Sequence, residues 1–315
     1  MTKGLFRKLS FAVIFLFSLT LFSCGTAKTV YKAGADTVTA AADLIIPDEK
    51  PVLKKKVLIA PIINQTGITN NIDEVIRQIL LSRFGEDKYL LISKLDKDSN
   101  QAINPRTLQY GIVIDTEQVK KAQEAGMNIL ISCVFHPIES NVERKGIWPF
   151  RKNRRIIGIS ISINAVDTTN NTLAASVNES VYLKTGEINP DDSVEWKPDI
   201  NLVREGIESV LDQLCDSVSN KLMHYPWQSK IYKSENNAYI IRAGQDIGID
   251  KSTVFELYAK GEPIESYTGD EYFILGSKLG EAGVVSVSRD KTVLGINPDI
   301  EKDNSIEVIR VKRPD

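Results

Sequence analysis

The fold is decided by the stretch Ile157-Gly-Ile-Ser-Ile-Ser-Ile-Asn-Ala165, in which apolar residues alternate with small or polar ones. A period of two places the isoleucines on one face of a β-strand and the serines on the other. The turn-forming run from Asp167 to Asn171 follows, and Leu173 to Tyr182 returns as a partner strand. The stretch therefore predicts an antiparallel hairpin with one buried face.

The segments on either side of this hairpin predict further strands and helices. Apolar runs and helical spacing indicate the following elements: strands over Val57 to Ile63, Leu90 to Ser93 and Asn128 to Phe135, and helices over Ile72 to Phe84, Asp115 to Ala125 and Leu202 to Met223. The resulting order, β-α-β-α-β-β-β-α, indicates a mixed sheet with helices packed on it. We expect an α+β fold for residues 56 to 224.

The chain changes character after Pro226-Trp227, where short strands separated by glycine-rich turns replace the helices. The expected strands are Lys230 to Tyr232, Ala238 to Arg242, Thr253 to Tyr258, Tyr272 to Gly276, Gly283 to Val287, Thr292 to Ile296 and Ile306 to Val311. Short strands at this spacing are typical of a small barrel or sandwich. Residues 226 to 315 are thus predicted to form a second, all-β domain.

The N-terminus carries an export signal. Three basic residues precede the apolar run from Leu9 to Phe22, as in a secretory signal peptide over residues 1 to 23. The run ends in Leu21-Phe-Ser-Cys24-Gly25, which resembles a bacterial lipobox. That resemblance implies that Cys24 is acylated, for example with palmitate, and becomes the mature N-terminus; an ordinary signal peptide that contains a cysteine is the alternative. Gly25 in place of an aspartate favours the outer membrane, so we expect a protein anchored there and facing the periplasm.

Residues 24 to 55 show no sustained periodicity and are interpreted as a lipidated tether. At about 3.3 Å per residue, such a segment could reach on the order of 100 Å from the membrane.

Composition excludes several classes of function. The chain has 315 residues and a net charge of −2, so no global basic field favours nucleic acid. Its two histidines, His136 and His224, lie in unrelated contexts and are interpreted as structural. Neither a metal or cofactor motif nor a catalytic triad can be written. Cys133 and Cys215 are interpreted as buried thiols, with a disulfide as the alternative in an oxidising compartment.

Two blocks of sequence resemble known families. The first is Lys56-Val-Leu-Ile-Ala-Pro-Ile-Ile-Asn-Gln-Thr66, together with the hairpin that ends in Asn164-Ala-Val-Asp-Thr-Thr-Asn-Asn-Thr-Leu-Ala-Ala175. It resembles the α/β domain of the secretion lipoprotein CsgG, of LpoB-type synthase activators and of the middle part of FlgT. The second, Ala238-Tyr-Ile-Ile-Arg-Ala-Gly-Gln-Asp-Ile-Gly248 with Val254-Phe-Glu-Leu-Tyr258, resembles the C-terminal β-domain of FlgT. The resemblance implies a CsgG/TolB-N-like domain followed by a small SH3-like one.

A basic, aromatic segment is the strongest local candidate for a binding site. Between two expected strands, it carries Trp148 and Phe150 among six cations: Arg144, Lys145, Arg151, Lys152, Arg154 and Arg155. Tryptophan and arginine are enriched in binding hot spots, and cation clusters attract anionic headgroups or acidic proteins. The alternative is a solvated hairpin end whose aromatic side chains pack against their own domain.

These features together predict a non-enzymatic envelope protein that assists the assembly of a flagellar, cell-wall synthase or secretion machine. Expected partners are the membrane, through acylated Cys24, and one or more envelope proteins; a homo-oligomer is compatible with the sequence. The alternative is a CsgG-like secretion channel subunit, whose spanning strands would need about 9 to 11 alternating residues. The interval from Lys184 to Ile200 is short and polar, which disfavours it. A cell-wall hydrolase is a third, weaker hypothesis.

Overall fold

The structure is a computed structural model of the whole chain, and it describes residues 52–69, 71–93, 116–188, 197–233, 238–259, 261–265, 271–301 and 306–312. Cys24, the predicted signal peptide and most of the predicted tether lie outside these ranges. One compact unit begins at Leu53 and extends to the C-terminus, and it holds all the described helices and strands. Leu53 is buried and Lys55 opens the first strand, so the folded unit includes the last residues of the segment assigned to the tether.

The first part of this unit is a mixed seven-stranded sheet with helices on both faces. Its elements are β1 (Lys55–Ile59), β2 (Ile63–Asn64), α3 (Ile72–Gly85), β3 (Leu90–Ser93), α4 (Thr116–Glu124), β4 (Ile129–Phe135), β5 (Glu139–Lys145), β6 (Lys152–Asp167), β7 (Leu173–Ile188) and α5 (Ile200–His224). The strand order is β3-β1-β4-β6-β5, in which β4 and β5 pair with successive parts of β6. In addition, β2 pairs with β4, and β7 pairs with β6 along nearly its whole length. The predicted mixed sheet with packed helices is confirmed.

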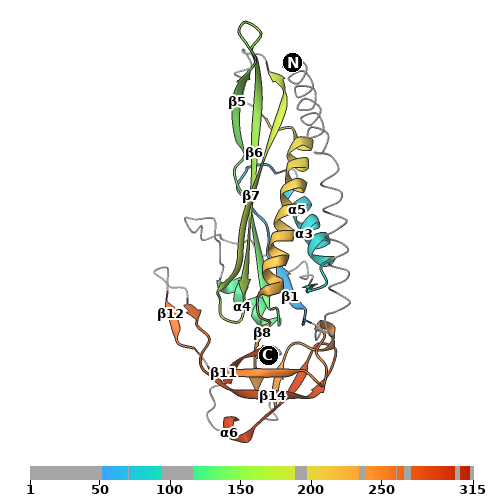
Figure 1. Cartoon of the computed structure of the whole chain (residues 1–315), viewed down its shortest axis with the longest axis vertical. Coiled ribbons are helices and arrows are strands. Elements are labelled where there is room, and N and C mark those ends of the chain that lie inside the picture. The colour runs from blue at the N-terminus through green and yellow to red at the C-terminus, as the bar shows by residue number, and fades with distance from the viewer. Residues whose placement is uncertain are drawn as a thin grey trace, which may run out of the picture. The chain divides into compact units, whose positions relative to one another are not determined.

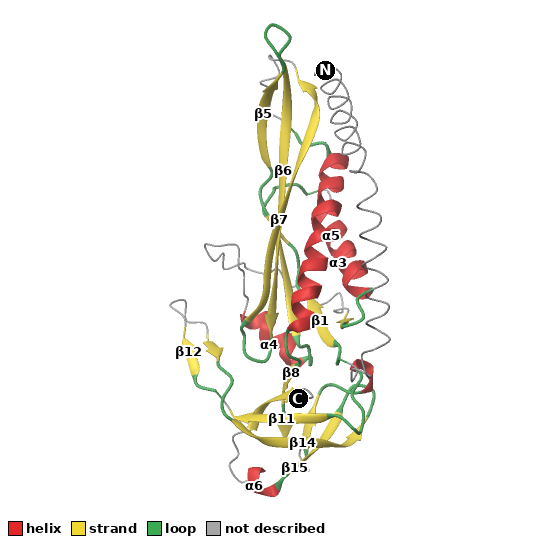
Figure 2. Ribbon diagram, viewed as in Figure 1, coloured by secondary structure: helices red, strands yellow, loops and turns green. Residues whose placement is uncertain are grey.

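Alternation in β6 sets which face of the sheet is covered. Ile157, Ile159, Ile161 and Ile163 are fully buried in the same core as the apolar stripes of α3 and α5. Figure 2 shows both helices running along this side of β6 and β7. The opposite face is covered by α4, whose Val119 and Ala122 pack in a smaller cluster with Leu130. Burial of the isoleucine row therefore fixes the register of the hairpin, because a slip of one residue would expose it.

The long helix α5 is positioned at both ends by its sequence. The side chain of Asp199 caps the helix by accepting a hydrogen bond of 2.9 Å from the backbone N–H of Asn201. Val203, Ile207, Leu211 and other apolar residues at helical spacing form its buried stripe, and the helix ends at His224 just before Pro226. The expected helix over Leu202 to Met223 is confirmed.

The second part of the unit is an all-β sheet that nearly closes on itself. It contains β8 (Gln228–Lys230), β9 (Tyr232–Lys233), β10 (Tyr239–Ile241), η2 (Gln245–Ile247), β11 (Val254–Ala259), β14 (Lys278–Val287), β15 (Thr292–Ile296), α6 (Pro298–Glu301) and β16 (Ile306–Val311). A separate two-stranded hairpin is formed by β12 (Pro263–Glu265) and β13 (Glu271–Phe273). In the order β8-β16-β11-β14-β15-β10-β9, the two edge strands are separated along the chain by Ile231 alone, so one segment lines both edges of the barrel.

Besides the small cluster beneath α4, two larger apolar cores stabilise the described parts. The sheet and helices enclose the first, and the second gathers Trp227, Phe255, Leu257 and neighbouring strand residues inside the barrel. Leu53 joins the barrel core although it precedes β1 of the other sheet. In the part of the chain that the structure describes, no helix is long and apolar enough to cross a membrane.

Candidate functional site

The basic, aromatic segment forms the end of the β5–β6 hairpin. The two strands pair antiparallel from Glu139 opposite Gly158 to Lys145 opposite Lys152, and residues 146 to 151 form the loop between them. The backbone N–H of Phe150 donates to the carbonyl oxygen of Ile147 at 2.7 Å, which closes this loop into a turn. Figure 1 shows the loop at the end of the hairpin, beyond the ends of α3 and α5.

Gly146 is required for this turn. Its φ of 114° lies in a region that residues with a side chain rarely adopt, and an added Cβ would lie 2.9 Å from the carbonyl oxygen of Phe150. The peptide bond between Trp148 and Pro149 is cis. The backbone conformation of Gly146 thus permits the turn that places the apolar side chains at the end of the hairpin.

Three large apolar side chains in this loop point into solvent. The exposed fractions are 84% for Ile147, 78% for Trp148 and 80% for Phe150, and we call these residues the tip triad. Such exposure differs from the alternative in which the aromatic side chains pack against their own domain. Clusters of exposed apolar side chains mark contact sites more often than scattered single ones do.

The six basic residues of the predicted binding site are divided between the hairpin loop and the strands behind it. Arg144, Lys145, Arg151 and Lys152 are exposed and directly flank the tip triad. Arg154 and Arg155 are partly buried further along β6, where Arg154 stands opposite Glu143 and a guanidinium N–H of Arg155 donates to Ser140 Oγ at 2.9 Å. The structure therefore gathers four of the six cations around the triad and holds the other two in the sheet.

The turn at Asn64 to Gly67 satisfies its own polar groups. The Asn64 side-chain carbonyl accepts from Thr66 N at 3.0 Å and Oγ1 at 2.7 Å, while its amide donates to the Ile68 carbonyl oxygen and to Asp73. These bonds within the segment are typical of a structural turn.

The two histidines lie far from the hairpin loop. His136 Nε2 lies 2.5 Å from Ser162 Oγ on the sheet face, and burial lowers the pKa of this histidine. His224 Nδ1 hydrogen-bonds the carbonyl oxygen of Asn220 at the end of α5. Cys133 and Cys215 are both buried free thiols in the main core. Among the described residues, no group of three or more histidine, cysteine or acidic side chains could hold a metal.

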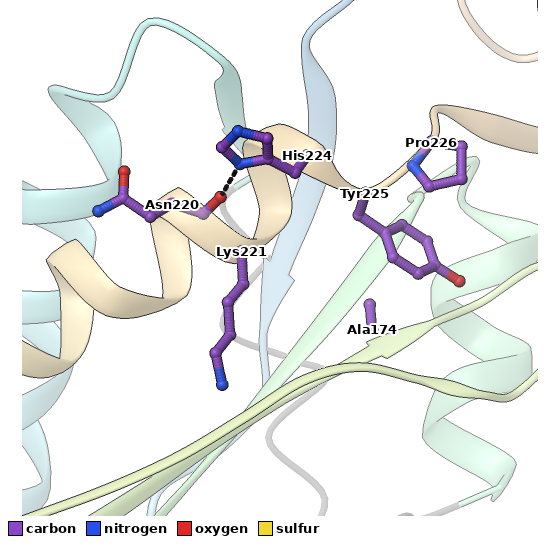
Figure 3. A pocket seen from close by; sticks show the side chains of 6 residues that line it. All are labelled: Ala174, Asn220, Lys221, His224, Tyr225 and Pro226. Atoms are coloured by element: carbon purple, nitrogen blue, oxygen red, sulfur yellow. Dashed lines mark hydrogen bonds between the residues drawn. The ribbon is translucent and has the colours of Figure 1, made fainter.

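An open hollow of about 530 Å³ lies where the end of α5 meets β7 (Figure 3). It is lined by Ala174, Asn220, Lys221, His224, Tyr225 and Pro226. The Lys221 ammonium donates to the carbonyl oxygen of Ser176, and the ring of Tyr225 lies over Ala174 in Figure 3. Because its two basic side chains, Lys221 and His224, already hydrogen-bond backbone carbonyl oxygens, this hollow is a weaker candidate than the hairpin loop.

Sequence reasoning missed a buried polar junction between the two cores. The Asn128 side chain accepts from Lys56 N at 2.9 Å and donates to the carbonyl oxygen of Gln228 at 2.8 Å. Gln228 in turn donates to Asp167 Oδ2 at 2.8 Å and accepts from Arg310 Nε at 2.7 Å. The Lys56 ammonium also pairs with the Asp246 carboxylate. We call these residues, with Asp246, the polar junction. In the sequence, Asp167 follows the row of isoleucines and opens the turn-forming run, so the pattern alone indicates an ordinary turn residue.

Burial within the polar junction changes the pKa of Asp167. Its side chain is 2% exposed, and this burial raises its pKa to about 6 although hydrogen bonds from Thr169, Gln228 and Tyr225 favour the carboxylate. Tyr225 has its own pKa raised to about 12 by burial and by the nearby Asp167. Asp167 accepts from Thr169 in the turn after β6 and from Gln228 in β8, so its geometry indicates a structural link between the sheet and the barrel.

Comparisons with known proteins give similarities to solved structures only. No family model and no curated protein matches the chain. The protein CT253 from Chlamydia trachomatis is 12% identical, with 55% of this chain and 97% of that one covered and a TM-score of 0.33. Lipoprotein GNA1162 from Neisseria meningitidis is 14% identical, with coverages of 51% and 99% and a TM-score of 0.29. A minor lipoprotein from Acinetobacter baumannii is 6% identical, with coverages of 54% and 92% and a TM-score of 0.27. Similarities at this level assign neither family nor function, so the candidate site rests on the chain's own residues.

Proposed function

We propose that this protein is a lipid-anchored, non-enzymatic factor of the bacterial cell envelope that acts through the end of its β5–β6 hairpin. The observation that carries the proposal is the tip triad, whose three large apolar side chains are held in solvent by a closed turn. Tryptophan and arginine are among the side chains that most often dominate binding energy. A contact function explains why the tip triad lies outside both cores.

The N-terminal sequence supports the proposed location at the outer membrane. The signal peptide and the lipobox-like Leu21 to Gly25 support acylation of Cys24, and Gly25 supports sorting to the outer membrane with the folded unit in the periplasm. Several acyl chains bury enough methylene groups for stable attachment, whereas one chain binds only marginally. The CsgG-like and FlgT-like resemblance of the two parts supports a role in a secretion, cell-wall synthase or flagellar machine.

Metabolic labelling tests the anchor. Radioactive palmitate should label the wild-type protein in growing cells and leave Cys24→Ala unlabelled, while Cys133→Ala, which alters a buried thiol, serves as the matched cysteine control. A wild-type protein that is soluble and unlabelled would contradict the proposal. Peptidoglycan digestion by the purified protein would contradict its non-enzymatic part, and ion conductance in planar bilayers would favour the channel alternative.

A further inference from the structure

The tip triad has the geometry of an element that inserts into an apolar layer. Ile147, Trp148 and Phe150 sit within one closed turn at the end of a two-stranded ribbon, and each is more than three-quarters exposed. The strand residues immediately behind them, Arg144, Lys145 and Lys152, are polar and exposed. The apolar surface is therefore confined to the loop, and charged groups mark how far the hairpin could enter an apolar layer.

The charges around the tip triad indicate the sign of the charge on the surface that it contacts. Residues 144 to 155 contain six cations and no acidic residue. The pairing register places Lys145 directly opposite Lys152 at the base of the loop. This register concentrates positive charge at the base of the loop, and basic residues near a membrane surface are attracted to anionic lipid. The exposed cations therefore fit a surface of negative charge.

An anionic bilayer fits both features at once. Tryptophan favours the headgroup region of a membrane, where its ring is amphipathic, and lysine and arginine extend their charged ends toward lipid phosphates. Basic residues next to the surface add attraction for anionic lipids. A protein partner would need a matching pocket for three adjacent apolar side chains, whereas a bilayer accepts them without one.

We propose that the loop Gly146 to Arg151 inserts the tip triad into the headgroup region of a bilayer that contains anionic lipid, while the flanking cations bind its phosphates. This inference rests on the proposed function only in placing the protein at a membrane, and it gives the hairpin a membrane contact that is independent of acylated Cys24. Through it, the folded unit would be oriented on the membrane as well as tethered to it.

Vesicle binding by the non-acylated chain tests this proposal. Residues 25 to 315 are the predicted mature chain without its lipidated cysteine, and the three apolar clusters of the described residues lie at or after Leu53, so this chain keeps the whole folded unit. The chain should sediment with phosphatidylcholine vesicles that contain phosphatidylglycerol, and more weakly with phosphatidylcholine alone. Replacing the tip triad by serine should weaken binding about tenfold or more. The matched control, Ile264→Ser with Val285→Ser, changes exposed apolar residues elsewhere and should bind like the wild type.

A charge variant separates the two parts of the contact. Replacing Arg144, Lys145, Arg151 and Lys152 by serine should remove the preference for phosphatidylglycerol and the sensitivity to salt, since exposed charges are screened beyond about 10 Å at 0.1 M. The residual affinity should equal that of the unmodified chain for phosphatidylcholine. Binding that stays anionic-selective in this variant would contradict the role given to the cations.

Tryptophan fluorescence reports insertion directly. In a Trp196→Phe background the remaining indoles are Trp148, which is exposed, and Trp227, which is 5% exposed in the barrel. Anionic vesicles should shift the emission to the blue, brominated lipid should quench it, and Trp148→Phe should abolish both effects. Absence of vesicle binding by the folded chain, or binding that the triad variant retains, would overturn the proposal. Capture of a protein by the tip without vesicle binding would overturn it too, while leaving the contact function intact.

Discussion

Lys56 and Asp246 form a salt bridge between the two parts of the folded unit, with a distance of 2.8 Å between Nζ and Oδ2. Lys56 lies on β1 and Asp246 in η2, and their side chains are only 10% and 18% exposed. The Lys56 ammonium also donates to the carbonyl oxygen of Arg242 at 3.3 Å. Because each charge depends on the other for its compensation, this pair links the sheet to the barrel.

Removal of one partner should therefore be costly. We expect Asp246→Ala to lower the free energy of unfolding by about 3 kcal/mol, because it leaves a mostly buried ammonium without its carboxylate. Replacing Lys56 by methionine in the same chain should restore part of the loss, and urea unfolding would measure both. The control Glu117→Ala removes the exposed pair with Lys121 on α4 and should leave stability nearly unchanged. An equal loss of unfolding free energy in Asp246→Ala and Glu117→Ala would show that the polar junction is not an energetic link.

Asp167 should make stability depend on pH. Its pKa is about 6 in the folded protein and about 3.9 in the unfolded chain, so the folded state takes up the proton first. The stabilising contribution of the neutral acid is therefore complete below pH 4 and is lost as pH rises through 6.

Comparison with Asp167→Asn isolates this effect. Between pH 4.5 and 7.5, the wild type should lose about 2 kcal/mol relative to the variant, since an amide does not titrate. The variant itself should cost about 1 to 3 kcal/mol at the acidic end, because its amide would face the Gln228 amide, whose oxygen already accepts from Arg310. Parallel stability curves for the two proteins would contradict the raised pKa.

Helix α5 packs closely against the sheet at Gly206. A Cβ there would lie 2.9 Å from Leu183 Cδ1 and closer still to Ile159 Cδ1, and both terminal methyl groups would have to shift. Because the higher helix propensity of alanine offsets about 1 kcal/mol of this overpacking, Gly206→Ala should destabilise the protein by only about 1 kcal/mol. Gly186 on β7 has open space around the same position, and Gly186→Ala is the matched control. A melting temperature unchanged by both substitutions would mean that the contact between α5 and the sheet is looser than described.

The two core thiols should be unreactive in the native protein. Burial raises the pKa of Cys133 well above its ordinary value and that of Cys215 to about 12, so neither forms the nucleophilic thiolate near neutral pH. A thiol reagent at pH 8 should label neither cysteine until urea unfolds the chain, when both should react. Rapid labelling of the folded protein would contradict the burial of Cys133 and Cys215.

Local patterns in the sequence were sufficient for most of the fold. The period of two in β6 and the helical stripes of α3 and α5 each predicted which residues face the core, because one buried face dictates the spacing. Strand β5 was missed, since most of its residues are exposed and it is held by backbone pairing with β6. Strands β6 and β7 also extend further than their apolar residues indicated.

The candidate site was predictable in part, for a related reason. Two aromatic residues inside a run of cations stand out in the sequence, and their neighbour Ile147 proved equally exposed. The polar junction could not be predicted, because Lys56 and Asp246 are 190 positions apart and Lys54 to Lys56 has the composition of a solvated tether. Only the fold shows that this lysine cluster enters the sheet.

The central claim, that the hairpin end is a contact element, is tested most directly by photo-crosslinking in intact cells. A benzophenone amino acid placed at position 148 of the full-length protein should form adducts, whereas the same probe at position 285, an exposed valine of the barrel, should form few. Replacing Ile147 and Phe150 by serine should abolish the adducts at 148 and leave the melting temperature nearly unchanged. Equal yields at the two positions, or a variant that melts several degrees earlier with its adducts intact, would contradict the account.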